Sequence, residues 1–411
     1  MPVDLSRIPE PATRNRPPSL KRWSMVLLIF LVLGGFLTSS LWPAQKVVRE
    51  ALFWHCFITA PLVIWAVFLG IRWLIYLAVE WPASGWDHER KQDIANEIRR
   101  GQRSLLLLGV GVQLPHVVES TTLSQQFLVP QGLALPAVVD KNTQAVSFLA
   151  RFNDEGLIFF ERVIERMNKL FSESAIQNSL QQRNVNRTLT IVVQIAYENI
   201  LSKEELAYIQ SFILHLFSTS RIHISSQFGL KDIDHWLDAP DSFADLLLVS
   251  VNLQPELSDG EGEAAVALLF QVAEDVSDND SAVAYIHRPE IARDAAEIST
   301  SVSQALQWGK TQAEDIASVW LAGMGVESKV QSLLASSTLK FPRAEGDKHL
   351  VDIDMKSGHT GVTSPWLAVA LAAKNMDIVP NPQLVMSISD KNASFYCLVI
   401  HPQVSASQKK L

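Results

Sequence analysis

Two long, uncharged apolar stretches near the amino terminus constrain this chain more than any other feature of its sequence. Residues 24–42 (SMVLLIFLVLGGFLTSSLW) and residues 51–71 (ALFWHCFITAPLVIWAVFLGI) contain no charged side chain. At about 1.5 Å per helical residue, each stretch is long enough to cross a hydrocarbon core of about 30 Å. Because only a short loop separates them, the sequence predicts a two-helix transmembrane hairpin within residues 23–79.

Two other interpretations of these stretches are a buried pair of core helices and a cleaved signal peptide. Two such runs, back to back and of this length, argue against a core pair. The first run begins only at residue 24 and is followed at once by a second span. It is also longer than the apolar region of a usual signal peptide, so we favour the membrane hairpin.

Basic residues lie on both outer sides of the hairpin and are sparse between the spans. The positive-inside rule therefore places both termini in the cytoplasm. We expect a disordered cytoplasmic tail over residues 1–22, which are rich in proline and arginine, and a linker helix over residues 80–103. The basic residues are Arg7, Arg14, Arg16, Lys21 and Arg22 before the hairpin, Lys46 and Arg49 within it, and Arg72, Arg90, Lys91, Arg99, Arg100 and Arg103 after it.

Residues 104–411 contain no third apolar span and have the pattern of an α/β domain. Continuous apolar runs of strand length alternate with amphipathic helical patterns, which predicts a sheet buried on both faces. The predicted strands are 105–112, 189–195, 246–251, 264–271, 351–353 and 395–400, and the predicted helices are 155–171, 203–216, 291–308, 326–335 and 365–373.

Composition excludes several functional classes. The 411 residues carry a net charge of −8, so there is no overall basic surface for nucleic acid. The two cysteines, Cys56 and Cys397, cannot form a cysteine-rich zinc site. The polar residues His349, Asp352, Asp354 and His359 lack convincing metal-ligand spacing, and no phosphate-binding glycine motif occurs, so we expect neither a metal nor a cofactor.

Four segments of the soluble part, in order, resemble landmarks of the β-ketoacyl synthases, a branch of the thiolase fold. They are SLLLLGVGVQLP (104–115), ADLLLVSVNL with GEGEAAVALLF (244–253 and 260–270), MKSGHTGVTSPWLAVALAAKNMDIVPNPQL (355–384) and SDKNASFYCLVI (389–400). The resemblance implies a five-layer αβαβα domain built from two similar halves, 104–270 and 271–411. It also implies an active-site region between the halves and a homodimer.

The resemblance fails at most of the catalytic positions. The family uses a cysteine nucleophile at a helix amino terminus, and this position falls near Ser225; no cysteine lies between Cys56 and Cys397. The first catalytic histidine is replaced by Ala322, in AGMGV. The family's lysine and second histidine match Lys356 and His359, with a spacing two residues shorter than the family's. Because removing one member of a catalytic unit costs orders of magnitude in rate, the resemblance implies a pseudoenzyme.

Other interpretations of these positions remain open. His359 can serve simply as a helix cap or a partner of the backbone, and Lys356 can be a surface or loop ion-pair residue. Ser225 and Ser226 would be nucleophiles only beside a base; His223 and His235 are near in sequence, but no Ser-His-Asp pattern emerges. Gln227 offers a minor alternative, since some related decarboxylases carry glutamine in place of the cysteine.

The combination of a membrane hairpin and a ketosynthase-like domain without its nucleophile also resembles an adaptor family of bacterial type VI secretion. That resemblance implies an inner-membrane tether that binds a lipase effector in the cytoplasm and passes it to a VgrG-type spike protein. The competing interpretation is an enzyme that handles acyl thioesters, as a hydrolase, decarboxylase or acyltransferase, with His359 and Lys356. A general membrane-protein assembly factor is a third interpretation.

Overall fold

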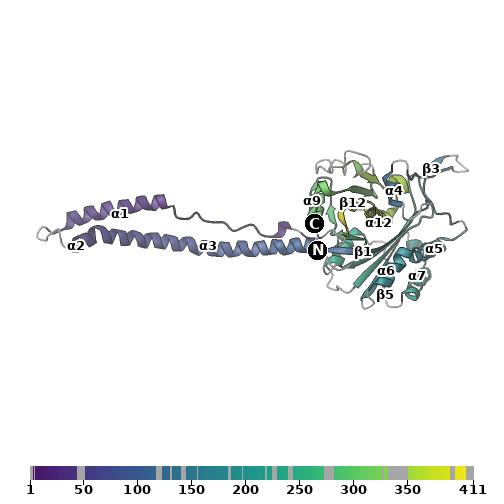
Figure 1. Cartoon of the computed structure of the whole chain (residues 1–411), viewed down its shortest axis with the longest axis horizontal. Helices are drawn as coiled ribbons and strands as arrows, with labels where there is room; N and C mark the ends of the chain where they lie inside the picture. Colours follow the sequence, from purple (N-terminus) through teal and green to yellow (C-terminus); the bar gives the residue numbers. More distant parts are fainter. Residues whose placement is uncertain are drawn as a thin grey trace. The chain divides into compact units, whose positions relative to one another are not determined.

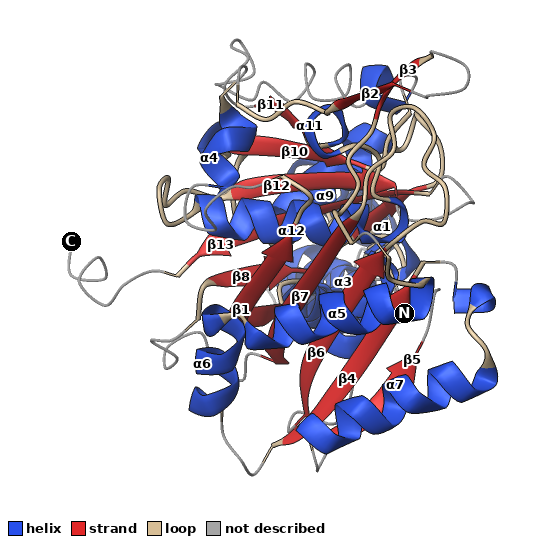
Figure 2. Cartoon of the chain, turned by 90° about the vertical axis from the view of Figure 1, so that its right-hand side faces the viewer, coloured by secondary structure: helices blue, strands red, loops and turns tan. Residues whose placement is uncertain are grey.

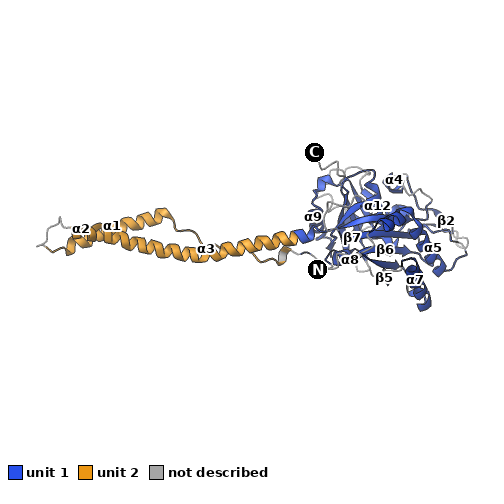
Figure 3. Ribbon diagram, turned by 60° about the horizontal axis from the view of Figure 1, so that its bottom comes forward, with its two compact units in different colours: residues 1–3, 99–411 blue, residues 4–98 orange. Residues whose placement is uncertain are grey.

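The computed structural model divides the chain into two compact units, one of residues Asp4–Ile98 and one of Met1–Val3 with Arg99–Leu411 (Figure 3). The structure describes residues 3, 5–43, 51–116, 123–129, 132–139, 145–154, 156–183, 187–196, 198–217, 220–224, 229–238, 244–272, 282–325, 328–331, 350–388 and 394–403. Ser225, Ser226, Gln227 and His349 lie outside these residues.

The smaller unit is a helical hairpin. It contains α1 (Leu20–Leu41), α2 (Ala51–Trp54), a π-helical turn (His55–Thr59) and the first part of α3 (Ala60–Gly101). Close packing joins α1 to α3: a side chain at Gly34 would overlap the ring of Pro61, and Trp65 Nε1 donates a hydrogen bond to the carbonyl of Trp23 at 2.9 Å.

The hairpin has two helices long and apolar enough to cross a membrane. They are Leu20–Leu41 and Ala51–Gly101, and almost none of their most apolar window is buried within the structure. Core helices of a soluble protein would instead bury an apolar face. The length, the composition and the exposure of these helices therefore agree with the predicted spans.

Helix α3 continues through Pro82 to Gly101, so the second span and the predicted linker are one helix. Part of the predicted tail contacts this helix within the same unit. Arg14 forms ion pairs with Glu80 at 2.9 Å and with Asp87 at 2.6 Å, and Trp86 Nε1 donates to the carbonyl of Glu10 at 3.2 Å.

The larger unit is built on one mixed sheet (Figures 1 and 2). The strand order is β11-β10-β12-β13-β8-β1-β7-β6-β4-β5, and β9 pairs with β13. The strands are β1 (Ser104–Gln113), β4 (Thr188–Ile195), β5 (Ser220–Ile224), β6 (Ala244–Asn252), β7 (Ala264–Val272), β8 (Ala284–His287), β9 (Glu290–Ala292), β10 (Ser318–Ala322), β11 (Leu350–Asp352), β12 (Gln383–Ile388) and β13 (Phe395–Pro402). Strand β8 pairs with both β1 and β13, and so joins the strands of the two predicted halves.

Helices cover the sheet in the order expected for five layers. One outer cluster packs α5 (Phe159–Ser172), α6 (Ser174–Gln182) and α7 (Lys203–Leu216) against β1, β4, β6 and β7. The central cluster holds α4 (Leu123–Leu128), α8 (Leu230–Leu237) and α12 (Ser364–Asn375) between the two parts of the sheet. The other outer cluster packs α9 (Ile298–Trp308) against β10, β12 and β13. Figure 2 shows α12 among the strands, with α5, α6 and α7 to one side.

Helix α12 is the centre of this arrangement. All of its residues except Lys374 are buried, and its sequence SPWLAVALAAKN has no polar face. A helix that is apolar on all sides is expected in a core, and its alanines let strands approach from both directions. The short remaining elements are η1 (Leu5–Arg7), η3 (Glu198–Ile200), η4 (Ala313–Asp315), α11 (Asp354–Ser357), η5 (Gly361–Thr363) and the ribbon of β2 (Ala137–Val139) and β3 (Val146–Phe148).

The six predicted strands are confirmed, and α7 begins and ends where the sequence places it. The prediction of a helix from residue 291 to 308 is wrong at its start, because residues 290–292 pair with β13 as β9 and the helix begins at Ile298. Of the helix predicted over residues 326–335, the structure describes residues 328–331 as helical, and the others lie outside the described residues, as do residues 392–393 of the fourth motif's turn.

Candidate functional site

The candidate site lies where the segments that resemble a ketosynthase catalytic centre come together. Ala322 ends strand β10 and is completely buried. Lys356 belongs to α11, and His359 follows two residues after that helix ends. The fourth predicted position, Ser225, lies outside the described residues.

An aspartate of this chain fills the turn that follows Ala322. The backbone amides of Gly323 and Met324 donate to Asp354 Oδ1 and Oδ2, each at 3.1 Å. Gly323 has a φ of +70°, which favours glycine. Burial raises the pKa of Asp354. Two adjacent amides of this kind would suit an oxyanion, but here the carboxyl group of Asp354 occupies them.

Lys356 caps a helix. Its Nζ donates to the carbonyls of Gln126 at 3.1 Å, Phe127 at 2.9 Å and Val129 at 2.5 Å, which form the carboxyl-terminal end of α4. The last carbonyls of a helix have no partner within the helix and carry partial negative charge. An ammonium group has three N–H donors, and these carbonyls use all of them. Burial lowers the pKa of Lys356, and its contacts are with carbonyls instead of with the carboxylate expected for an ion pair.

His359 is exposed, and its backbone pairs with the GEG turn. Its amide donates to the carbonyl of Gly260 at 2.8 Å, and the amide of Gly262 donates to the carbonyl of His359 at 3.2 Å. Gly358, just before it, has a φ of +76°, and a Cβ there would lie 2.5 Å from the carbonyl carbon of Glu261. The Gly-His-Thr and Gly-Glu-Gly motifs therefore support one another structurally.

A buried polar network fills the space between β4, β6 and the start of α12. Gln194 Oε1 accepts from Ser250 Oγ and from Trp366 Nε1, each at 3.0 Å, and Ser250 Oγ lies 2.8 Å from Thr363 Oγ1. Our sequence reasoning missed these residues. The available signal was a polar residue near the carboxyl end of each of two mostly apolar strands, Gln194 in TLTIVVQI and Ser250 in ADLLLVSVN.

No protein-family model and no curated protein matches this sequence. Solved structures do match it. "The ishigamide ketosynthase/chain length factor" is 12% identical, covers 73% of this chain and 100% of its own, and has a TM-score of 0.50. A type II polyketide-synthase acyl-carrier protein in complex with its ketosynthase is also 12% identical, with 73% and 99% covered and a TM-score of 0.50. The larger unit of this chain has a thiolase-like, ketosynthase-like fold. At this identity the likeness concerns the fold alone, and it confirms the fold that the four motifs predict.

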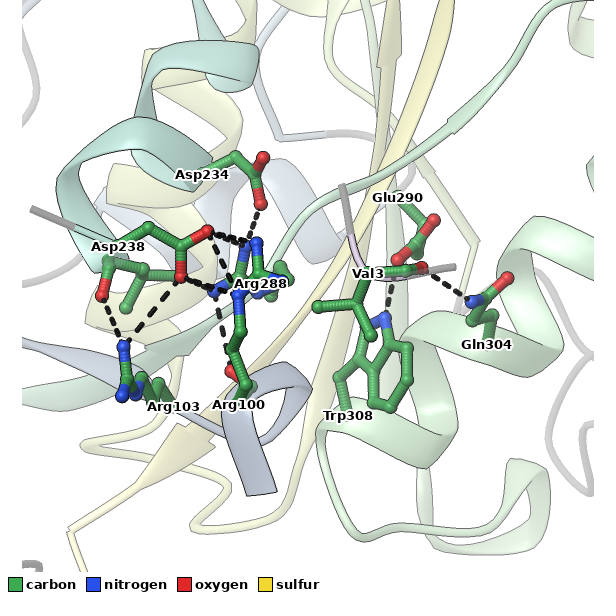
Figure 4. Close-up of polar contacts among 10 residues, drawn as sticks. Val3, Arg100, Arg103, Asp234, Asp238, Arg288, Glu290, Gln304 and Trp308 are labelled. Carbon is green, nitrogen blue, oxygen red and sulfur yellow. Dashed lines mark hydrogen bonds and ion pairs between the residues drawn. The ribbon is translucent and has the colours of Figure 1, made fainter. Parts of the chain in front are cut away.

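A second polar network surrounds the buried Arg288 and includes Arg100, which lies in the last turn of α3 and belongs to the larger unit (Figure 4). The guanidinium of Arg288 is completely buried and pairs with Asp234 of α8 and, at 2.7 Å, with Asp238. Asp238 also pairs with Arg100 at 2.6 Å. Burial acts to raise the pKa of Asp238, but hydrogen bonds from Arg100 and Arg288 outweigh it and hold that pKa well below its usual range. These charges neutralise one another, which is typical of a structural network.

Glu290 lies beside this network in the ketosynthase-like domain. It accepts a hydrogen bond from Trp308, and the carbonyl of the buried Val3 accepts one from Gln304 at 3.4 Å (Figure 4). Burial raises the pKa of Glu290 to about 7. Among the described residues, no three His, Cys, Asp or Glu side chains are grouped so that they could hold a metal ion.

Proposed function

We propose that this protein is a non-catalytic, membrane-anchored adaptor whose ketosynthase-like domain binds a partner protein. The observation that carries the proposal is the position of Lys356. Its ammonium is committed to three carbonyls of α4, where it stabilises a helix end and has no N–H left for a substrate. A residue that matches a catalytic lysine by sequence therefore has a structural role.

The rest of the candidate site supports the same conclusion. Ala322 has no group that transfers a proton, and Asp354 occupies the amides of the adjoining turn. Cys397 lies completely buried in β13, where burial raises the pKa of its thiol well above the ordinary value. Because the thiolate is the nucleophile, Cys397 cannot replace the missing cysteine.

For the partner, we propose a lipase effector of type VI secretion that is loaded onto a VgrG-type spike protein. The support is that the combination of a membrane hairpin with a ketosynthase-like domain that lacks its nucleophile resembles this adaptor family. The basic residues that flank the hairpin support an inner-membrane tether with the domain in the cytoplasm.

An acyl-thioester enzyme remains the second candidate because His359 is exposed and therefore accessible to a substrate. It differs from the adaptor in one measurable property. If the protein is an enzyme, replacing His359 abolishes thioester turnover. If it is an adaptor, replacing His359 leaves partner binding unchanged.

The test is co-purification from native membranes with the tagged full-length chain as bait, with the partners identified by mass spectrometry. Wild type and His359→Ala are compared, and both are assayed for hydrolysis of palmitoyl-CoA. We expect both forms to recover the same lipase or spike protein and neither to turn over the thioester. Recovery of acyl carrier protein alone, with turnover that His359→Ala abolishes, would refute the adaptor.

A further inference from the structure

A separate two-stranded ribbon exposes an apolar face on the ketosynthase-like domain. Strands β2 and β3 form this ribbon, in which Ala137 lies opposite Phe148 and Val139 opposite Val146 (β3 is labelled in Figure 1). Side chains alternate along a strand, so these four residues share one face. The exposed fractions are 52% for Val139, 55% for Val146 and 51% for Phe148. The ribbon therefore has an apolar face that the domain does not cover.

The ribbon is anchored through β3. The amide of Phe148 donates to Asp259 Oδ1 at 2.6 Å, and the amide of Gly260 donates to the carbonyl of Phe148 at 2.8 Å. Gly260 also accepts from the amide of His359, so the loop that holds β3 is the loop of the candidate site. The ribbon thus extends from the rim of the degenerate site.

The other strand of the ribbon, β2, has an open edge. The amide of Leu149 donates to the carbonyl of Pro136 at 3.1 Å, and this fixes which backbone groups face β3. In an antiparallel pair the hydrogen-bonded positions alternate, so the backbone groups of Ala137 and Val139 face away from β3. No third strand joins β2 within the described part of the chain. An unpaired, apolar edge is a template for another strand.

Charge around the anchoring loop favours a basic occupant. The loop exposes the carboxylates of Glu256 and Asp259, with Glu261 half-buried beside them. One cation, Arg151, lies at the same loop and donates to the carbonyl of Pro255 at 3.2 Å. Carboxylates therefore outnumber cations here, and a lysine- or arginine-containing segment is attracted.

We propose that β2 binds an extended, apolar and basic segment of the partner protein by strand addition. The segment's backbone pairs with Ala137 and Val139, and its alternate apolar side chains lie beside those of Ala137 and Val139 and extend the apolar face of the ribbon. Addition of a third strand stabilises the ribbon, because a lone two-stranded ribbon is marginally stable. The identity of the partner rests on the proposed function, whereas the binding edge can be tested without it.

The test uses full-length protein in nanodiscs and two fluorescent eight-residue probes. Both probes alternate valine and threonine; one is flanked by lysines and the other by glutamates. Val139→Pro removes an outward-facing donor from the β2 edge and keeps an apolar side chain. Glu256→Lys reverses one exposed charge in the loop that anchors β3, and Glu314→Lys, on η4, is the matched control for charge.

We expect wild type to prefer the lysine-flanked probe, and Val139→Pro to weaken its binding about tenfold, as loss of about 1.4 kcal/mol implies. Glu256→Lys should weaken it about threefold at low salt, and Glu314→Lys should leave it unchanged. Absence of probe binding, equal binding of both probes, or full binding by Val139→Pro would overturn the proposal. The proposal would also be overturned if wild type formed a dimer, bound neither probe and became a monomer in Val139→Pro. The β2 edge would then bind a second copy of this chain.

Failure of this proposal is distinguishable from failure of the proposed function. If wild type and Val139→Pro recover the same partner from membranes in equal amounts, the adaptor stands and the β2 edge is not its docking site. If wild type recovers no protein partner while the lysine-flanked probe still binds at the β2 edge, the strand-binding edge stands and the adaptor function fails.

Discussion

Replacement of Glu290 by glutamine should stabilise the ketosynthase-like domain at neutral and alkaline pH. Glu290 lies in β9 and is 7% exposed. Burial raises its pKa from 4.5 to about 7, and the nearby Asp234 acts in the same direction, whereas the hydrogen bond from Trp308 and the charge of Arg288 act against the rise. Another titratable group, the thiol of Cys397, lies close by: its Sγ is 3.8 Å from the carbonyl oxygen of Glu290.

The size of the effect follows from this pKa. Because the pKa of Glu290 is higher in the folded state than in the unfolded state, its neutral form favours folding. This contribution to the free energy of unfolding is complete below about pH 4.5 and is lost as the pH rises through about 7. At about 1.4 kcal/mol per pKa unit, the ionised group costs about 3 kcal/mol at pH 8. Glutamine carries no charge at any pH, and its oxygen can still accept from Trp308. Burying the new NH₂ group of glutamine costs about 1 kcal/mol. We therefore expect the free energy of unfolding at pH 8 to rise by about 2 kcal/mol in total.

Pulse proteolysis in urea, on the full-length chain in nanodiscs, measures this gain at pH 5, 6, 7 and 8. The difference between Glu290→Gln and wild type should grow from pH 5 to pH 7 and level off by pH 8. Burial lowers the pKa of His287 to about 3, so both forms also lose stability as the pH falls below about 6.5. That loss cancels in the comparison. Glu314→Gln, which makes the same change at an exposed carboxylate, is the control. A constant difference between Glu290→Gln and wild type would refute the reasoning.

Three further substitutions test the structural roles assigned above. Arg288→Met removes the buried guanidinium that pairs with Asp234 and Asp238 and should lower the free energy of unfolding by about 3–5 kcal/mol; urea denaturation measures the loss, and a change below 1 kcal/mol would contradict the network. Lys356→Met removes the cap of α4 and should cost about 1–2 kcal/mol and speed amide exchange in Gln126–Val129; unchanged exchange there would show that the cap is dispensable. Gly358→Ala forces alanine into a positive φ against Glu261 and should cost about 1–3 kcal/mol; Gly325→Ala, where a Cβ meets nothing within 4 Å, is the control.

The success of the sequence predictions depended on how local the determining interactions are. Helix α7 was predicted at its true bounds, because Ser202 and Glu205 form reciprocal hydrogen bonds at its start and its apolar residues repeat at helical spacing. The long central strands were predicted because both of their faces are buried, so that they are continuously apolar.

Three of the strands that the prediction missed show a physical reason. Strands β5 (SRIHI), β8 (AYIH) and β9 (EIA) have few residues and mixed polarity. Such segments become strands because a neighbour supplies hydrogen bonds across the sheet, and that neighbour is distant in the sequence. Strand β9 shows this, since its pairing with β13 displaced the start of the predicted helix.

The sequence by itself determined the membrane-type helices, the alternating α/β pattern and the absence of any cysteine between Cys56 and Cys397. These features depend on residue type and local spacing alone. Only the tertiary structure decided what the surviving residues do. Lys356 meets a carbonyl 230 residues away in sequence, and Asp354 meets amides 31 and 30 residues away. The packing of the layers selects such distant hydrogen-bond partners. The same packing leaves the edge of β2 open and brings Lys356 and Asp354 against backbone groups.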